Sequence, residues 1–154
     1  MLTARQINIF LTGLTEGFQS PIPTQGKIEV GMPERVTEGG AYGSVVLGHL
    51  FQGDIHGRLT VTLEWEDCFR LVQKITGHLE ETFTQTAQRT LEELMYSSAA
   101  RISEWLAQEG NRVAIFPVPT QLNSRVLLGL RRDIPILRVP VVSPLAKLDV
   151  YLAF

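Results

Sequence analysis

The sequence predicts an α+β fold in which a largely antiparallel sheet of about six strands packs against helices on one of its faces. One observation behind this prediction is the segment 84–109, which contains no glycine or proline and repeats its apolar residues at helical spacing. Another is the pair of segments 44–52 and 56–65, which flank a short turn as the two arms of a β-hairpin do. Strands joined by short turns run antiparallel.

The composition is that of one folded domain, which we expect to span residues 1–154. Of the 154 residues, 44% are apolar and 19% are charged, which are ordinary values for a protein with a buried core. The formal net charge is −2, so no general positive field indicates a nucleic-acid partner. Glutamates gather between residues 78 and 110 and arginines after residue 111, as an acidic helix beside a mildly basic sheet would explain.

No segment indicates a membrane or a secretion route. The apolar runs fall short of the roughly 18 residues that a membrane-spanning helix needs. The N-terminal residues lack the charged and apolar regions of a signal peptide. Cys68 is the single cysteine, which leaves no internal disulfide and favours a reducing compartment. We therefore expect a cytoplasmic protein without a membrane partner.

Residues 3–18 should form an amphipathic helix, because apolar residues recur one turn apart and Thr3 suits the N-cap position. Prolines and a glycine then indicate a loop at 20–26. The segment 27–36 is extended in pattern but contains a glycine and a proline, which is typical of a weak or edge strand. A turn over residues 37–40 leads into the hairpin.

The hairpin and the short helix after it have clear patterns. In the second hairpin arm Leu59, Val61 and Leu63 alternate with polar residues, which predicts one buried and one solvent-exposed face. A short helix over 66–76 follows, and Gly77 fits the position at which such helices end.

The segment 84–109 is the longest predicted helix, and it has one apolar and one polar face. The apolar face consists of Ala87, Leu91, Leu94, Met95, Ser98, Ile102, Trp105 and Leu106. The opposite side consists of Arg89, Glu93, Tyr96 and Ala100. Glu93 should therefore lie near the middle of a solvent-exposed face, which is either an ordinary wet surface or a site displayed on a rigid helix.

After this helix, residues 112–118 should form a short strand that Pro119 closes. The segment 121–133 mixes features of strand and loop, and both possibilities stay open. Two final strands are expected over 134–142 and 145–154, where apolar residues alternate with polar ones.

The residue types that usually carry enzyme chemistry do not form a recognisable motif. The three histidines fall on different predicted elements and share no metal-ligand spacing with Cys68, so we expect structural roles for them. They are His49, His56 and His78. No phosphate-binding loop or nucleophile elbow is present.

Two pairs of neighbouring residues on the long helix invite a catalytic interpretation. Glu92 and Glu93 point about 100° apart on a helix, so their carboxylates should not converge as a general acid and base would. Ser97 and Ser98 have no base beside them, which favours a role in helix packing.

Several segments resemble the CheC/CheX/FliY chemotaxis phosphatases, and CheX most of all. They are the opening helix INIFLTGLTEGF, the hairpin GHLFQGDIHGRLTVTLEW, the helix end LVQKITG, the long helix and the closing LAKLDVYLAF, which together cover nearly the whole chain. The family signature is (Asp or Ser)-x3-Glu-x2-Asn-x22-Pro, with the Glu and the Asn on an exposed helix face. Glu93 and Pro119 match it, whereas Arg89 replaces the first residue and Tyr96 replaces the Asn.

The resemblance implies a CheX-like fold and a partner, the phosphorylated receiver domain of a CheY-like response regulator. In this family the Glu contacts the receiver's active-site lysine, and the Asn amide orients the water that attacks the aspartyl phosphate. Glu93 is then the candidate catalytic residue. The candidate partner-binding residues are Arg89, Glu93, Tyr96, Ser97 and Pro119. No cofactor or metal is implied for this chain, because any Mg²⁺ belongs to the receiver.

Tyr96 offers one hydroxyl on a long arm in place of a compact amide, so we expect weak or absent phosphatase activity. One alternative is an active phosphatase in which Ser97 or another polar group nearby replaces the missing Asn. Another is a non-catalytic structural homodimer. A homodimer is expected in any case from the resemblance, because CheX-like proteins pair their sheets and the C-terminal strands here supply an apolar edge.

The same residues also have plain structural interpretations. Glu93 could be a solvated helix residue paired with Arg89 one turn away. Tyr96 could lie across its neighbours on the surface, and Pro119 could simply end a strand.

Overall fold

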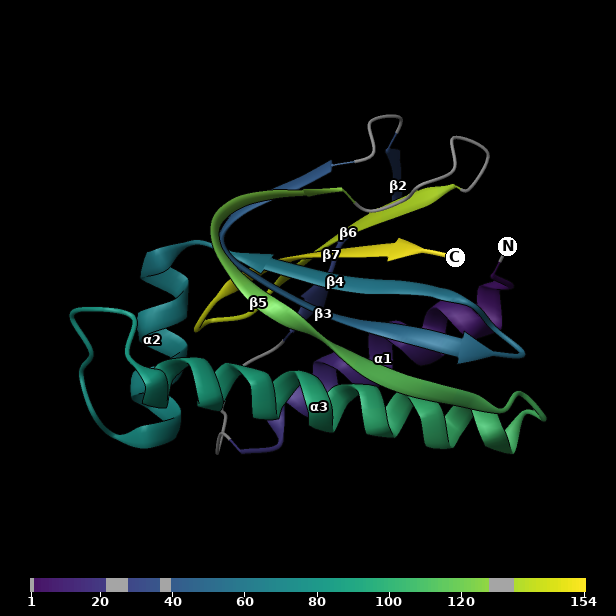
Figure 1. Ribbon diagram of the computed structural model, residues 1–154, viewed down its shortest axis with the longest axis horizontal. Helices are drawn as coiled ribbons and strands as arrows, with labels where there is room; N and C mark the ends of the chain where they lie inside the picture. Colours follow the sequence, from purple (N-terminus) through teal and green to yellow (C-terminus); the bar gives the residue numbers. More distant parts are fainter. Residues whose placement is uncertain (1, 22–27, 37–39, 128–134) are drawn as a thin grey trace.

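The computed structural model describes residues 2–21, 28–36, 40–127 and 135–154, which form three α-helices and a seven-stranded antiparallel sheet (Figure 1). The elements are α1 (Ala4–Gln19), β1 (Glu29–Val30), β2 (Glu34–Val36), β3 (Gly40–Gly53), β4 (Gly57–Leu63), α2 (Trp65–Thr76), α3 (Gln85–Gln108), β5 (Val113–Leu127), β6 (Ile136–Val142) and β7 (Lys147–Ala153). The strand order is β1-β6-β7-β4-β3-β5, and β2 also pairs with β6. The predicted α+β class is confirmed, with one strand more than expected.

The helices begin and end where the sequence indicates. Thr3 caps α1 through a reciprocal pair of hydrogen bonds with Gln6, in which its hydroxyl accepts from the Gln6 N–H at 3.1 Å. Thr84 caps α3 by accepting from the Ala87 N–H at 3.1 Å. Gly77 ends α2 with a φ of 77°, a left-handed conformation that glycine adopts without strain.

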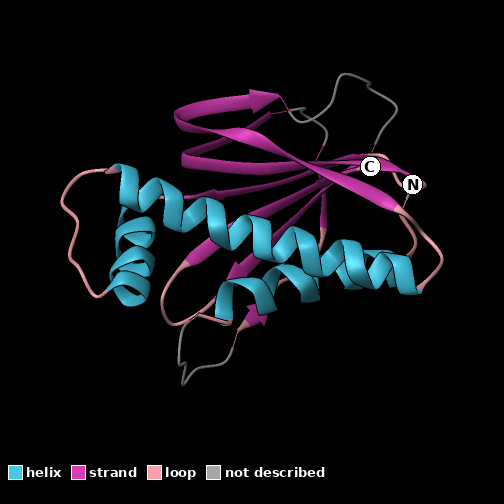
Figure 2. Ribbon diagram, turned by 60° about the horizontal axis from the view of Figure 1, so that its bottom comes forward, coloured by secondary structure: helices cyan, strands magenta, loops and turns pink. Residues whose placement is uncertain are grey.

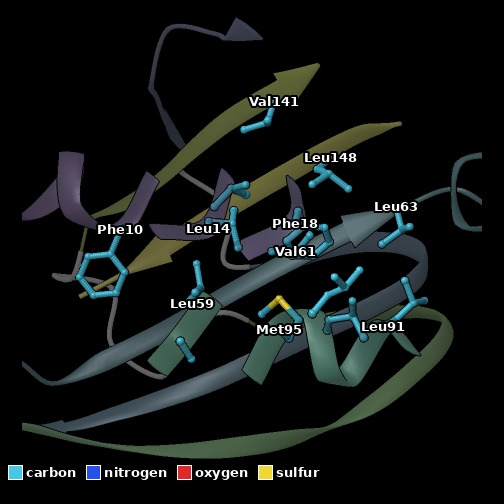
Figure 3. Packing of buried hydrophobic residues seen from close by; sticks show 14 of the residues in the cluster. Phe10, Leu14, Phe18, Leu59, Val61, Leu63, Leu91, Met95, Val141 and Leu148 are labelled. Atoms are coloured by element: carbon cyan, nitrogen blue, oxygen red, sulfur yellow. The ribbon is translucent and has the colours of Figure 1, made fainter. Parts of the chain in front are cut away.

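The core lies between the sheet and the paired helices α1 and α3, which cross one face of the sheet (Figure 2). Phe10 and Leu14 of α1 and Leu91 of α3 are fully buried, and they pack with the helix-facing residues of β4 such as Leu59 (Figure 3). Met95 is 1% exposed in the same cluster, so the predicted apolar face of α3 is the buried one.

The two long helices approach each other closely because α1 has glycines where they meet. A Cβ atom on Gly17 would lie 2.0 Å from the Ser98 hydroxyl oxygen and 2.8 Å from its Cα, and one on Gly13 would lie 2.6 Å from the Ile102 side chain. The Ser98 hydroxyl is buried and donates to the Leu94 carbonyl at 2.9 Å. Ser98 is therefore a packing residue, as the sequence favoured.

The prediction that one face of β4 is solvent-exposed is wrong. Thr60 and Thr62 are only 2% and 4% exposed. The first part of β3 pairs with β5 and not with β4, and it passes over the face of the sheet that is turned away from the helices. Gly43 in this part of β3 lies so close that an added Cβ would be 2.8 Å from the Thr62 side chain. Ala41 joins a second, smaller apolar cluster on that far face.

The strand after α3 also differs from the expectation. Pro119 does not close it, because β5 continues from Val113 to Leu127 and takes up the described part of the ambiguous segment 121–133. Prolines are tolerated here because β5 is an edge strand with a neighbour, β3, on one side only. The rest of that segment, 128–133, lies outside the described residues, as do most of the expected loop at 20–26 and turn at 37–40.

The C-terminal strands are present as predicted, but they do not form an edge. β7 lies between β6 and β4, and β6 carries both β1 and β2 on its other side. The apolar character of these strands therefore reflects burial inside the sheet. The segment 27–36 does supply the weak edge strands that its glycine and proline indicated, as β1 and β2.

We expect Gly17→Ala to lower the free energy of unfolding by about 1–3 kcal/mol, because the added methyl group forces α1 away from the backbone of α3. Urea unfolding followed by circular dichroism measures the change. The matched control is Thr12→Ala, an exposed position of the same helix, which should change stability by no more than about 0.5 kcal/mol. Equal stability of the two variants would contradict the close helix contact.

Candidate functional site

The outer side of α3, the first half of β5 and the middle of β3 enclose a groove of about 430 Å³. In Figure 1, β5 runs along α3 for most of the length of the helix. The groove is lined by Leu47, Gly48 and His49 of β3, by Arg89, Glu92, Glu93, Met95 and Tyr96 of α3, and by Pro117, Val118, Pro119 and Thr120 of β5. Four of the five predicted partner-binding residues are thus brought together, and Ser97 is not among the lining residues.

The spacing between Glu93 and Pro119 has a geometric origin. The helix from Glu93 to its end at Gln108 is roughly 22 Å long at 1.5 Å per residue. The strand from Val113 to Pro119 covers roughly 20 Å at 3.3 Å per residue. Because Gly110 turns the chain back between the two elements, Pro119 returns to the level of Glu93.

Glu93 and Tyr96 lie on the solvent-exposed side of α3, as predicted, and Tyr96 is 61% exposed. Among the described residues, no hydrogen bond or ion pair engages the carboxylate of Glu93 or the guanidinium of Arg89. The surface pair with Arg89, which was the alternative interpretation of Glu93, is therefore not formed. Both charges remain available to another molecule.

Glu92 has a different role from its neighbour, and no local pattern predicts it. Its Oε1 accepts hydrogen bonds at 2.8 Å from the hydroxyl of Thr120 on β5 and at 2.8 Å from the amide of Gln88 one turn earlier. This contact ties α3 to β5 beside Pro119. Glu92 therefore holds the two walls of the groove together, while Glu93 stays unpaired.

His49 was expected to be structural, and it is buried, but it also lines the groove. It is 3% exposed and lies between Leu47 and Phe51 on the helix-facing side of β3, where period-two alternation places it inward. Within the described part of the chain, neither of its ring nitrogens has a hydrogen-bond partner. Its ring centroid lies 6.4 Å from that of Tyr96, with an angle of 50° between the planes. Burial lowers the pKa of His49, so the ring is neutral at neutral pH.

No protein-family model and no curated protein matches this sequence. Solved structures do. The chemotaxis protein CheX from Desulfovibrio desulfuricans has a TM-score of 0.84 at 14% identity, over 97% of this chain and 98% of that one. A CheC-like superfamily protein from a Shewanella species has a TM-score of 0.84 at 17% identity, over 99% of this chain and 98% of that one. The chain has the CheX-like fold.

A further CheX-like structure is a complex. The CheX–CheY–BeF3–Mg²⁺ complex from Borrelia burgdorferi has a TM-score of 0.70 at 16% identity, and 96% of each chain is covered. These TM-scores establish the CheX-like fold for the present chain. At such low sequence identities the chemistry of the chain depends on the residues of its own groove.

Two further observations concern metal sites and membrane-spanning helices. Across the described ranges, no group of three or more histidine, cysteine, aspartate or glutamate residues is arranged to hold a metal ion. Within the same ranges, no helix combines the length and apolar character needed to cross a membrane.

The lowered pKa of His49 predicts how the free energy of unfolding changes with pH. Burial lowers the pKa of His49 in the folded chain below about 6.5. When the pH falls through about 6.5, the unfolded chain therefore binds a proton at His49 more readily than the folded chain does. The free energy of unfolding should therefore fall as the pH is lowered from 7 to 5, by at most about 1.4 kcal/mol per pH unit from this group.

Urea unfolding at several pH values checks this. His49→Gln should reduce the loss of stability on acidification. His56→Gln, at an exposed histidine, is the matched control. The same pH dependence in wild type and His49→Gln would show that His49 is not kept neutral by burial.

Proposed function

We propose that this chain docks on the phosphorylated receiver domain of a CheY-like response regulator through the α3–β5 groove, with Glu93 as the central contact. The observation that carries the proposal is the exposed, unpaired Glu93 carboxylate, held on a rigid helix beside Tyr96 and Pro119. The likeness of this chain to CheX in a solved CheX–CheY complex supports the choice of partner.

The groove has the composition of a protein-docking surface. Tyr96 and Arg89 are of the residue types that anchor protein interfaces, and the prolines of β5 form a stiff apolar wall beside them. Docking would cost little side-chain conformational entropy at this wall, because proline has few rotamers to lose. Glu93 adds a charge that selects a basic group on the partner.

We expect docking without efficient phosphatase activity. A phosphatase of this kind needs only to position water for in-line attack, because the aspartyl phosphate and its Mg²⁺ belong to the receiver and no cofactor of this chain takes part. Tyr96 stands where a compact amide would do this, and a misplacement of ~1 Å can cost about a hundredfold in rate. Ser97 lies outside the groove lining, which disfavours it as a substitute.

A second candidate function is a structural homodimer, and the exposed edge strand β5 favours it. Phe116 and Leu122 on this strand are 45% and 41% exposed. Prolines block strand addition along the first half of β5, so a second copy would pair along the half that contains Leu122.

The docking proposal predicts a role for one carboxylate on α3. Glu93→Ala should weaken binding to a CheY-like receiver loaded with BeF3 and Mg²⁺ by about tenfold or more, because a charge pair at the centre of an interface is lost. Isothermal titration calorimetry gives the affinity. Glu104→Ala, an exposed glutamate further along α3, should bind like wild type. Indistinguishable affinities for Glu93→Ala and wild type would rule out the proposed docking mode.

The activity proposal predicts a gain of function. Tyr96→Asn should speed phosphate loss from a labelled receiver by about tenfold or more, while the wild-type protein leaves the receiver near its own rate of hydrolysis. Rapid phosphate release by wild type that Glu93→Ala abolishes would instead establish the active phosphatase.

The homodimer is tested by light scattering at micromolar concentration. A dimeric mass for wild type and a monomeric mass for Leu122→Lys are expected if β5 is the interface, because a charge on an edge strand opposes pairing. A monomeric wild-type protein would eliminate this candidate.

A further inference from the structure

Within the described residues, two polar groups that face the same groove have no hydrogen-bond partner. The first is the imidazole of His49, which is 3% exposed and has no hydrogen bond at either nitrogen within the described chain. A neutral imidazole has one N–H donor and one acceptor nitrogen. Buried groups of this kind almost always find a partner, because leaving them unpaired is costly.

Most neighbours of His49 cannot supply that partner. Residue Pro117, which lies opposite His49 on β5, has no N–H to offer. The other inner lining residues, such as Leu47 and Val118, have apolar side chains. The Glu92 carboxylate is already bonded to Thr120 and Gln88.

Tyr96 is the neighbour whose ring lies against His49, and its hydroxyl is the second unpaired group. No residue in the described ranges bonds to this hydroxyl, which can both donate and accept. The rings of Tyr96 and His49 are 6.4 Å apart between centroids. A hydrogen bond from a tyrosine hydroxyl to an imidazole nitrogen places the two centroids roughly 6–7 Å apart. The distance between the two rings is therefore that of a hydrogen-bonded pair, and a Tyr96 rotamer that turns the hydroxyl toward His49 would form the bond.

We propose that His49 is a positioning residue for Tyr96: its ring nitrogen accepts a hydrogen bond from the Tyr96 hydroxyl and holds the tyrosine ring across the groove. The hydroxyl then points inward and the face of the ring points outward. A docking partner meets an aromatic surface at position 96, so the side chain that it places there is apolar. This last step rests on the proposed docking function, whereas the pairing of the two side chains does not.

The positioning also accounts for the expected lack of catalysis. A hydroxyl that is bonded to the floor of the groove is turned away from any phosphate on a docked receiver. Tyr96 then acts as a contact surface, and it has no free polar atom with which to orient water.

The pairing is tested on the free protein by nitrogen NMR of labelled histidine. Tyr96→Phe removes only the hydroxyl and should change the ring-nitrogen shifts of His49, while the signals of His56 and His78 stay in place as internal controls. Unchanged His49 signals would overturn the proposal, and they would indicate a bound water or no partner at all.

A double-mutant cycle tests the effect on docking. His49→Leu and Tyr96→Phe should each weaken binding to the BeF3-loaded receiver by roughly threefold to tenfold, and the double variant should bind no worse than either. His49→Gln, which keeps an acceptor, should recover part of the loss. Additive losses in the double variant would overturn the proposal. A receiver that does not bind wild type would defeat the docking function alone, because the NMR result on the free protein still decides the pairing.

Discussion

The contact between α1 and α3 fixes the rotation of α3 about its own axis, and the groove depends on that rotation. Backbone meets backbone where Gly17 lies against Ser98, so α3 has little freedom to turn. With Leu91 and Met95 held in the core, Glu93 and Tyr96 must face outward. A turn of α3 by one residue would move both of them by about 100° and take them out of the groove.

The second wall of the groove depends on the edge position of β5. In an interior strand, Pro117 and Pro119 would each remove a hydrogen bond from a ladder. At the edge these prolines cost little and form a stiff surface next to the helix. The hydrogen bond between Glu92 and Thr120 then connects the two walls, so the charged residues of α3 and the prolines of β5 form one site.

Local sequence patterns anticipated the helices, the caps at Thr3 and Gly77, the hairpin and the exposed side of α3, because these features depend on neighbours within a few residues. They failed where distant segments decide the outcome. Alternation predicts a solvent-exposed Thr62, but the start of β3 covers this residue, and the C-terminal strands that were expected at an edge lie inside the sheet. The site followed the same rule. Helical spacing predicted the exposed face of α3 and the family resemblance made its residues candidates, whereas His49 and Thr120 reach the groove from other strands, and only sheet pairing places them there.

Because β5 returns along α3, the number of residues between Glu93 and Pro119 determines whether the two lie side by side. The two halves of this segment have nearly equal length, one helical and one extended, and a residue counts for about 1.5 Å in the first and about 3.3 Å in the second. One residue inserted into β5 would slide Pro119 past Glu93 and also turn each following side chain to the other face of the strand. The segment from Glu93 to Pro119 should therefore tolerate substitutions at solvent-exposed positions far more readily than insertions or deletions.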